Sequence, residues 1–125
     1  MYSITVESAR KLVRVELSGF FSVEEVAAFA RDEQAAVAGM GCTTGEYLLL
    51  IDASGSKIQT QEVIADFQAF IANSPLKARR LAIVVGGSAA RMQVRRILAR
   101  DTAMIVCTRR EGEAWLFGDE DAAAA

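Results

Sequence analysis

The clearest pattern along the chain is a set of short, continuous apolar runs at 48–51, 81–85 and 103–107. Apolar runs of this length predict strands buried on both faces, which are typical of parallel sheets covered by helices. Nearer the start, apolar and polar residues alternate over 2–7 and again over 13–18. This alternation predicts a hairpin of two half-exposed strands, so the pattern as a whole predicts a five-stranded sheet.

Helical segments separate these strands, and several begin with a capping signal. Ser22 and Glu25 have capping-box spacing, with Phe21 and Val26 at hydrophobic-staple positions, and Thr60 is suited to be the N-cap of the next helix. The predicted order is β-β-α-β-α-β-α-β-α. We therefore expect an α/β fold: a single, mostly parallel five-stranded sheet with an antiparallel N-terminal edge strand, and successive helices distributed over both faces.

The end of the chain fits either an edge strand or a helix by periodicity alone. Thr108 and Glu111 again have capping-box spacing and Gly118 suits a C-terminal stop, so the sequence predicts a helix over 109–117 with Trp115 against the sheet. Residues 1–118 would then form one domain. The acidic, alanine-rich residues 119–125 are expected to fray.

Composition narrows the functional classes. The 125 residues are 52% apolar and 24% charged, with a single proline, which is typical of one globular domain. The net charge of −2 argues against nucleic acid as a partner. No apolar run is long enough to span a membrane, and the polar N-terminal segment does not resemble a secretory signal, so a cytoplasmic location is expected.

The chain contains no histidine, which excludes histidine-dependent nucleophilic catalysis and histidine metal sites. Its two cysteines, Cys42 and Cys107, match no metal-ligand spacing, and we expect free thiols with Cys107 buried. No metal site, no cofactor and no catalytic residue is predicted.

The first candidate site follows the central strand, because ligands of such folds meet the carboxyl ends of the strands. Hydroxyls, a glycine and an ammonium group beside a helix N-terminus could bind an anion or a partner, or the same side chains could simply satisfy turn amides. The candidate residues for partner or ligand binding are Asp52, Ser54, Ser56, Lys57, Thr60 and Glu62.

A second candidate is the glycine turn that opens the third predicted helix. Gly86, Gly87, Ser88 and Arg91 could bind an anion at the helix N-terminus, or Ser88 could be a plain cap. The spacing matches neither a P-loop nor a dinucleotide fingerprint. The polar face of this helix carries Arg91, Arg95, Arg96 and Arg100, which could face an acidic partner or only solvent.

The chain resembles the STAS domains over nearly its whole length, and in particular the SpoIIAA-like branch grouped with the CRAL-TRIO lipid-binding fold. The resemblance rests on the central strand with its exit loop at 49–55, on the next strand at 81–86, and on Ala114-Trp115-Leu116. It implies a SpoIIAA-like fold. Antagonists of this family carry a phosphorylatable serine in an Asp-Ser-Ser-Gly motif at the start of the second helix. Here that region reads Thr60-Gln61-Glu62-Val63, and the serine position falls on or beside Glu62.

Three functions remain open at this point. The first is a non-catalytic regulatory or protein-interaction module of STAS type without the usual phosphorylation motif, binding a protein partner and with a homodimer as a further option. The second is a carrier or sensor of a small lipid-like or anionic ligand, whose pocket would be lined by Ile64, Phe67, Phe70 and Ile71 unless these residues only form core. The third is an enzyme using carboxylate or lysine chemistry.

Overall fold

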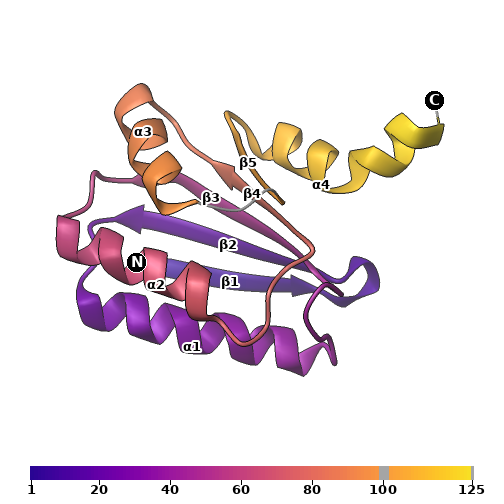
Figure 1. Cartoon of the computed structure of the whole chain (residues 1–125), viewed down its shortest axis with the longest axis horizontal. Helices are drawn as coiled ribbons and strands as arrows, with labels where there is room; N and C mark the ends of the chain where they lie inside the picture. The colour runs from indigo at the N-terminus through magenta and orange to yellow at the C-terminus, as the bar shows by residue number, and fades with distance from the viewer. Residues whose placement is uncertain (99–101, 125) are drawn as a thin grey trace.

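The computed structural model describes residues 1–98 and 102–124, and side chains as far as residue 118. It is an α/β fold with the predicted order of elements (Figure 1). A 3-10 turn, Ser8–Arg10, joins the first two strands. The strands are β1 Tyr2–Glu7, β2 Leu12–Gly19, β3 Leu48–Ser56, β4 Arg80–Val84 and β5 Ala103–Val106. The helices are α1 Val23–Gly39, α2 Gln61–Asn73, α3 Ser88–Ile97 and α4 Arg109–Ala124.

The five strands form one sheet in the order β1-β2-β3-β4-β5. β1 pairs antiparallel with β2, and every other pair is parallel, which confirms the predicted mixed sheet with an antiparallel N-terminal edge. Pairing of β2 with β3 shifts register between Glu16 and Ser18 and then continues to Gly19 opposite Ser56. The connections that leave β2 and β3 therefore start side by side.

Helices cover both faces of the sheet, as predicted, but their distribution differs from the prediction. α1, α2 and α3 pack on one face, and α4 alone packs on the other. The reason is the sheet order. Each parallel crossover adds the next strand on the same side of the previous one, so right-handed connections place all three crossover helices on one face. The sheet consequently has no point at which the strand order reverses, and such points are the usual ligand crevices of doubly wound folds.

The larger core lies between the sheet and α1 and α2. It contains alternate residues of each strand, such as Val15, Ile51 and Ile83, with Phe29 of α1 and Phe70 of α2. The smaller core lies under α4 and includes Leu50 and Leu116, with the half-buried Trp115 packed against it as predicted. Packing is close at Gly112 of α4: a Cβ atom there would lie 2.8 Å from Leu50 Cδ1, so the buried Leu50 side chain would have to shift.

The caps of three helices are confirmed, and one prediction is wrong. Ser22, Thr60 and Thr108 accept hydrogen bonds from the backbone N–H three residues later. Gly87, rather than Ser88, is the N-cap of α3, and no side chain caps that end. Ser88 is instead the first residue of the helix.

The predicted end of the last helix also needs correction. α4 does not stop at Gly118 but continues to Ala124. The predicted fraying of 119–125 concerns residues whose side chains lie outside the described part of the structure.

Both thiols are free, but Cys42 is the buried one and Cys107 is exposed. Cys107 follows β5, the edge strand of the sheet, where no neighbouring strand covers it.

Candidate functional site

The structure divides the first candidate site between the two faces of the sheet. Asp52 and Ser54 lie on the face of α4, where the Asp52 carboxylate is 3.5 Å from Arg109 Nε. Ser56 and Lys57 line an apolar cavity on the opposite face. Thr60 and Glu62 lie at the start of α2, Thr60 as its cap and Glu62 exposed in its first turn. The six residues therefore do not form one cluster.

Asp52, Ser54 and Ser56 lie within β3, and not in a loop that follows it as the sequence predicted. The Oδ1 of Asp52 accepts hydrogen bonds from the Ser54 backbone N–H at 3.0 Å and from the Ser54 hydroxyl at 2.6 Å. The hydroxyl of Ser56 donates to the Ala53 carbonyl at 2.8 Å. These side chains satisfy local backbone groups and one another within the strand.

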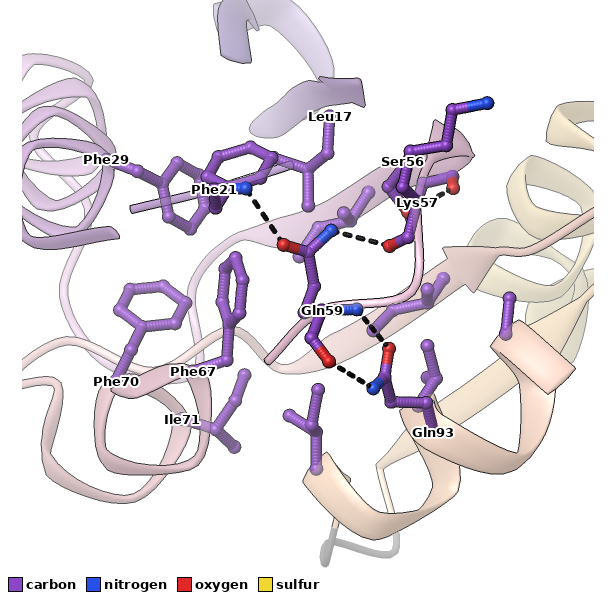
Figure 2. Close-up of a pocket in the computed structure, with 16 residues that line it drawn as sticks. Leu17, Phe21, Phe29, Ser56, Lys57, Gln59, Phe67, Phe70, Ile71 and Gln93 are labelled. Carbon is purple, nitrogen blue, oxygen red and sulfur yellow. Dashed lines mark hydrogen bonds between the residues drawn. The ribbon is translucent and has the colours of Figure 1, made fainter. Parts of the chain in front are cut away.

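The cavity lies between the sheet and the crossover helices, under the loops at the carboxyl ends of β2 and β3 (Figure 2). Its volume is about 70 Å³. Drug-sized or lipid ligands need cavities of about 300 to 1,000 Å³, so this space fits only a very small molecule. Most of its lining is apolar: Leu17, Phe21, Phe29, Ile51, Ala53, Phe67, Phe70, Ile71, Ile83, Ala90, Val94 and Ile97.

Gln59, which the sequence did not single out, closes the mouth of this cavity. Its side-chain amide donates to the carbonyls of Gly19 at 3.0 Å and Lys57 at 2.5 Å, and its oxygen accepts from Phe21 N at 2.9 Å. The backbone N–H of Lys57 also donates to Gly19 O at 3.0 Å. The loop after β2 is thereby tied to the loop after β3.

A second glutamine adds α3 to this arrangement. The side chain of Gln93 accepts from the backbone N–H of Gln59 and donates to its carbonyl, both at 3.0 Å (Figure 2). We refer to Gln59 and Gln93 together as the glutamine clasp. Both amide hydrogens of the Gln59 side chain are used in these bonds, so the clasp holds the chain at the edge of the cavity.

Large apolar side chains are exposed around the clasp. Phe20 is 70% exposed, Ile58 is 50% exposed and Met92 is 60% exposed. Each adjoins a residue of the hydrogen-bonded network, since Phe20 lies between Gly19 and Phe21, Ile58 precedes Gln59, and Met92 precedes Gln93. The sequence contained one indication that Phe20 is exposed, namely its position beside Phe21. Phe21 is the hydrophobic-staple residue and is buried, and the side chain of Phe20 points to solvent.

The second candidate site, at Gly86, Gly87, Ser88 and Arg91, remains a prediction. Gly86 packs against the backbone of Ser54, with 3.5 Å between its would-be Cβ atom and Ser54 O. Arg91 is half-buried, and Arg95 and Arg96 are exposed. Among the described residues, no carboxylate lies within ion-pairing distance of these three arginines. Arg100, the fourth predicted arginine, lies outside the described residues.

A buried carboxyl group lies far from these loops. Glu33 of α1 is 1% exposed, and this burial raises its pKa to about 7, although hydrogen bonds from Gln34 and Tyr47 act in the opposite direction. The Gln34 amide donates to both Glu33 oxygens, at 2.9 and 3.1 Å. Glu33 is not among the residues that line the cavity beside Gln59.

Among the side chains that the structure describes, in residues 1–98 and 102–118, no group of three or more histidine, cysteine, aspartate or glutamate residues could hold a metal ion. In residues 1–98 and 102–124, no helix is long and apolar enough to cross a membrane.

Comparison with known proteins places the fold. No protein-family model matches the sequence, and no curated protein matches it either. The structure is similar to that of an uncharacterised DUF3478-family protein with a SpoIIAA-like fold from Shewanella loihica PV-4, with a TM-score of 0.71 and 18% identity over 92% of this chain and 93% of that one. It is also similar to an anti-sigma factor antagonist from Mycobacterium paratuberculosis, with a TM-score of 0.62 and 17% identity over 93% and 94% of the two chains. The chain therefore has the SpoIIAA-like fold of the STAS domains.

Proposed function

We propose that the chain is a non-catalytic, cytoplasmic protein-interaction module of STAS type, and that it binds its partner through the loops at the carboxyl ends of β2 and β3. The observation that carries the proposal is the exposure of Phe20 and Ile58 on loops that hydrogen bonds hold in place. Apolar side chains exposed on a fixed surface are typical of binding sites, because a mobile loop would lose more conformational entropy on binding. We call Phe20, Lys57, Ile58 and Met92 the loop surface.

Two further observations support the proposal. A similar structure is that of an anti-sigma factor antagonist, a class named for its action toward another protein. The sequence contains no Asp-Ser-Ser-Gly motif, and Glu62 stands near the place where the resemblance puts the switch serine. We therefore propose a module whose binding does not depend on phosphorylation at that position.

Affinity capture tests this function. The tagged chain is used to retain proteins from a lysate of its source organism, in parallel with a Phe20→Ser/Ile58→Ser variant and a Met104→Ser control. Met104 is also exposed, at 40%, but lies on β5 away from the loop surface. We expect one partner in near-equal molar amount with the wild type and the control, and its loss with the double variant. Equal retention by all three chains, or no partner with any of them, would contradict the proposal.

The apolar cavity supports a second candidate function, binding of a small apolar molecule. Its volume of about 70 Å³ and its lining of phenylalanine and isoleucine side chains would accept a compact molecule, not an acyl chain. Native mass spectrometry of gently purified protein would show an added mass, and a Phe67→Trp variant that fills the cavity would lose it. A bare mass for the wild type would remove this candidate.

A further inference from the structure

The outward face of α3 is cationic in a chain whose net charge is −2. The helix contains Arg91, Arg95 and Arg96 and no acidic residue. At about 100° per residue, these arginines and Met92 fall on one side of the helix. Ala90, Gln93, Val94 and Ile97 fall on the other side and line the cavity. Met92, Arg95 and Arg96 are exposed and Arg91 is half-buried, so the four side chains form a cationic strip along this side of the helix.

Helix stability does not account for the whole strip. Arg95 and Arg96 lie in the last turn of α3, where positive charge interacts favourably with the helix dipole. Arg91 lies near the other end of the helix, where the dipole disfavours a positive charge. Met92, at 60% exposed, contributes little to the core. The charge at Arg91 and the apolar exposure at Met92 thus lack a structural explanation within the helix.

Side-chain hydrogen bonds connect α3 to α2 and to the loop after β3. Gln68 of α2 donates to the Arg96 carbonyl at 2.7 Å, and the glutamine clasp joins α3 to the loop that carries Ile58. Lys57, on the same loop, extends away from the cavity (Figure 2). Positive charges and exposed apolar side chains are therefore presented by elements that are hydrogen-bonded to one another.

From this arrangement we infer that the partner is a protein segment that carries acidic residues around one or two large apolar side chains. The acidic residues pair with Arg91, Arg95 and Arg96, and the apolar side chains pack on Met92, Ile58 and Phe20. The inference rests on the proposed function and specifies its partner. The argument for acidic residues in the partner is charge complementarity. No carboxylate among the described residues pairs with these three arginines, so their charges are available to a partner.

Selection from a display library of random 12-residue peptides on the full chain tests the inference. We expect the selected peptides to be enriched in both acidic and large apolar residues. For the tightest of them, an Arg91→Gln/Arg95→Gln/Arg96→Gln variant should raise Kd about tenfold at physiological salt, and its Kd should depend less on salt than that of the wild type. The matched control is Arg79→Gln/Arg110→Gln, at two exposed arginines off this surface, and should change Kd less than twofold.

The outcomes separate the inference from the function on which it rests. Peptides that lose affinity with Phe20→Ser/Ile58→Ser but not with the arginine variant would overturn the acidic partner and leave the loop surface as the docking site. Peptides sensitive to neither variant, or no selected peptide at all, would overturn both. Tighter binding of a 15-nucleotide single-stranded DNA than of any acidic peptide would also overturn the inference, because the arginines would then serve nucleic acid.

Discussion

Glu33 shows most clearly how burial changes the chemistry of a single residue. An exposed glutamate at this position of α1 would be ionised at neutral pH, whereas this one is 1% exposed and has a pKa of about 7. The groups facing it are the Gln34 amide, the Tyr47 hydroxyl and, across a small cavity, Lys77. The Lys77 ammonium is bound to the carbonyls of Ile71 and Ala72, so it does not neutralise Glu33.

The free energy of unfolding should therefore fall as pH rises through the window between the two pKa values of Glu33. Folding raises this pKa from 4.5 to about 7, so the native chain binds more protons than the unfolded chain in that range. The loss amounts to about 3 kcal/mol at most and levels off above pH 7. Urea unfolding at pH 5 and pH 8 measures it. Glu33→Gln should stabilise the chain more at pH 8 than at pH 5, and an equal effect at both would contradict the assignment.

Gln59 has an equally specific role, because one side chain forms three hydrogen bonds to two loops. Gln59→Leu should leave Phe21 N and Gly19 O without these partners, at a cost of about 1 to 3 kcal/mol in the free energy of unfolding. Denaturant melts measure the loss, and Gln61→Leu, at an exposed position in the first turn of α2, is the matched control. A Gln59→Leu variant as stable as the control would show that the clasp does not hold the loops.

At the scale of the elements, α4 is fitted to the sheet through a glycine. A Cβ atom at Gly112 would lie 2.8 Å from the buried Leu50 side chain, whereas at Gly118 of the same helix it would have nothing within 4 Å. Gly112→Ala should therefore destabilise the chain by about 1 to 3 kcal/mol despite the better helix propensity of alanine. Gly118→Ala should stabilise it by up to about 1 kcal/mol. Thermal melts of both variants test the packing of α4, and a stabilising Gly112→Ala would contradict it.

Features that depend on residues close together in the sequence could be predicted, whereas features that depend on distant residues could not. The caps at Ser22, Thr60 and Thr108 depend on residues three positions apart and were predicted correctly. The glutamine clasp joins Gln59 to residues up to 40 positions away, and no local pattern contains that information. The stop predicted at Gly118 failed because a single glycine costs a helix only about 1 kcal/mol.

At the scale of the whole molecule, the order of the strands in the sheet determines which face each helix covers, and local periodicity does not contain that order. Five strands and their types could be read from the sequence, but their consecutive order in the sheet could not, and that order placed α1, α2 and α3 on one face. It also made β5 an edge strand and exposed Cys107. The candidate residues from Asp52 to Lys57 lie at the carboxyl end of β3, and so does the proposed loop surface. Apart from Lys57, the residues of the loop surface were not predicted from the sequence, because exposure depends on what the fold leaves uncovered.

The central claim is that a partner protein binds at the loop surface, and site-specific photo-crosslinking in cells of the source organism tests it most directly. A photoreactive phenylalanine analogue at position 20 keeps an aromatic ring where Phe20 is exposed, and the same analogue at position 104 is the control. We predict one discrete protein adduct from position 20 and none from position 104. No adduct from position 20, or the same adducts from both positions, would contradict the account.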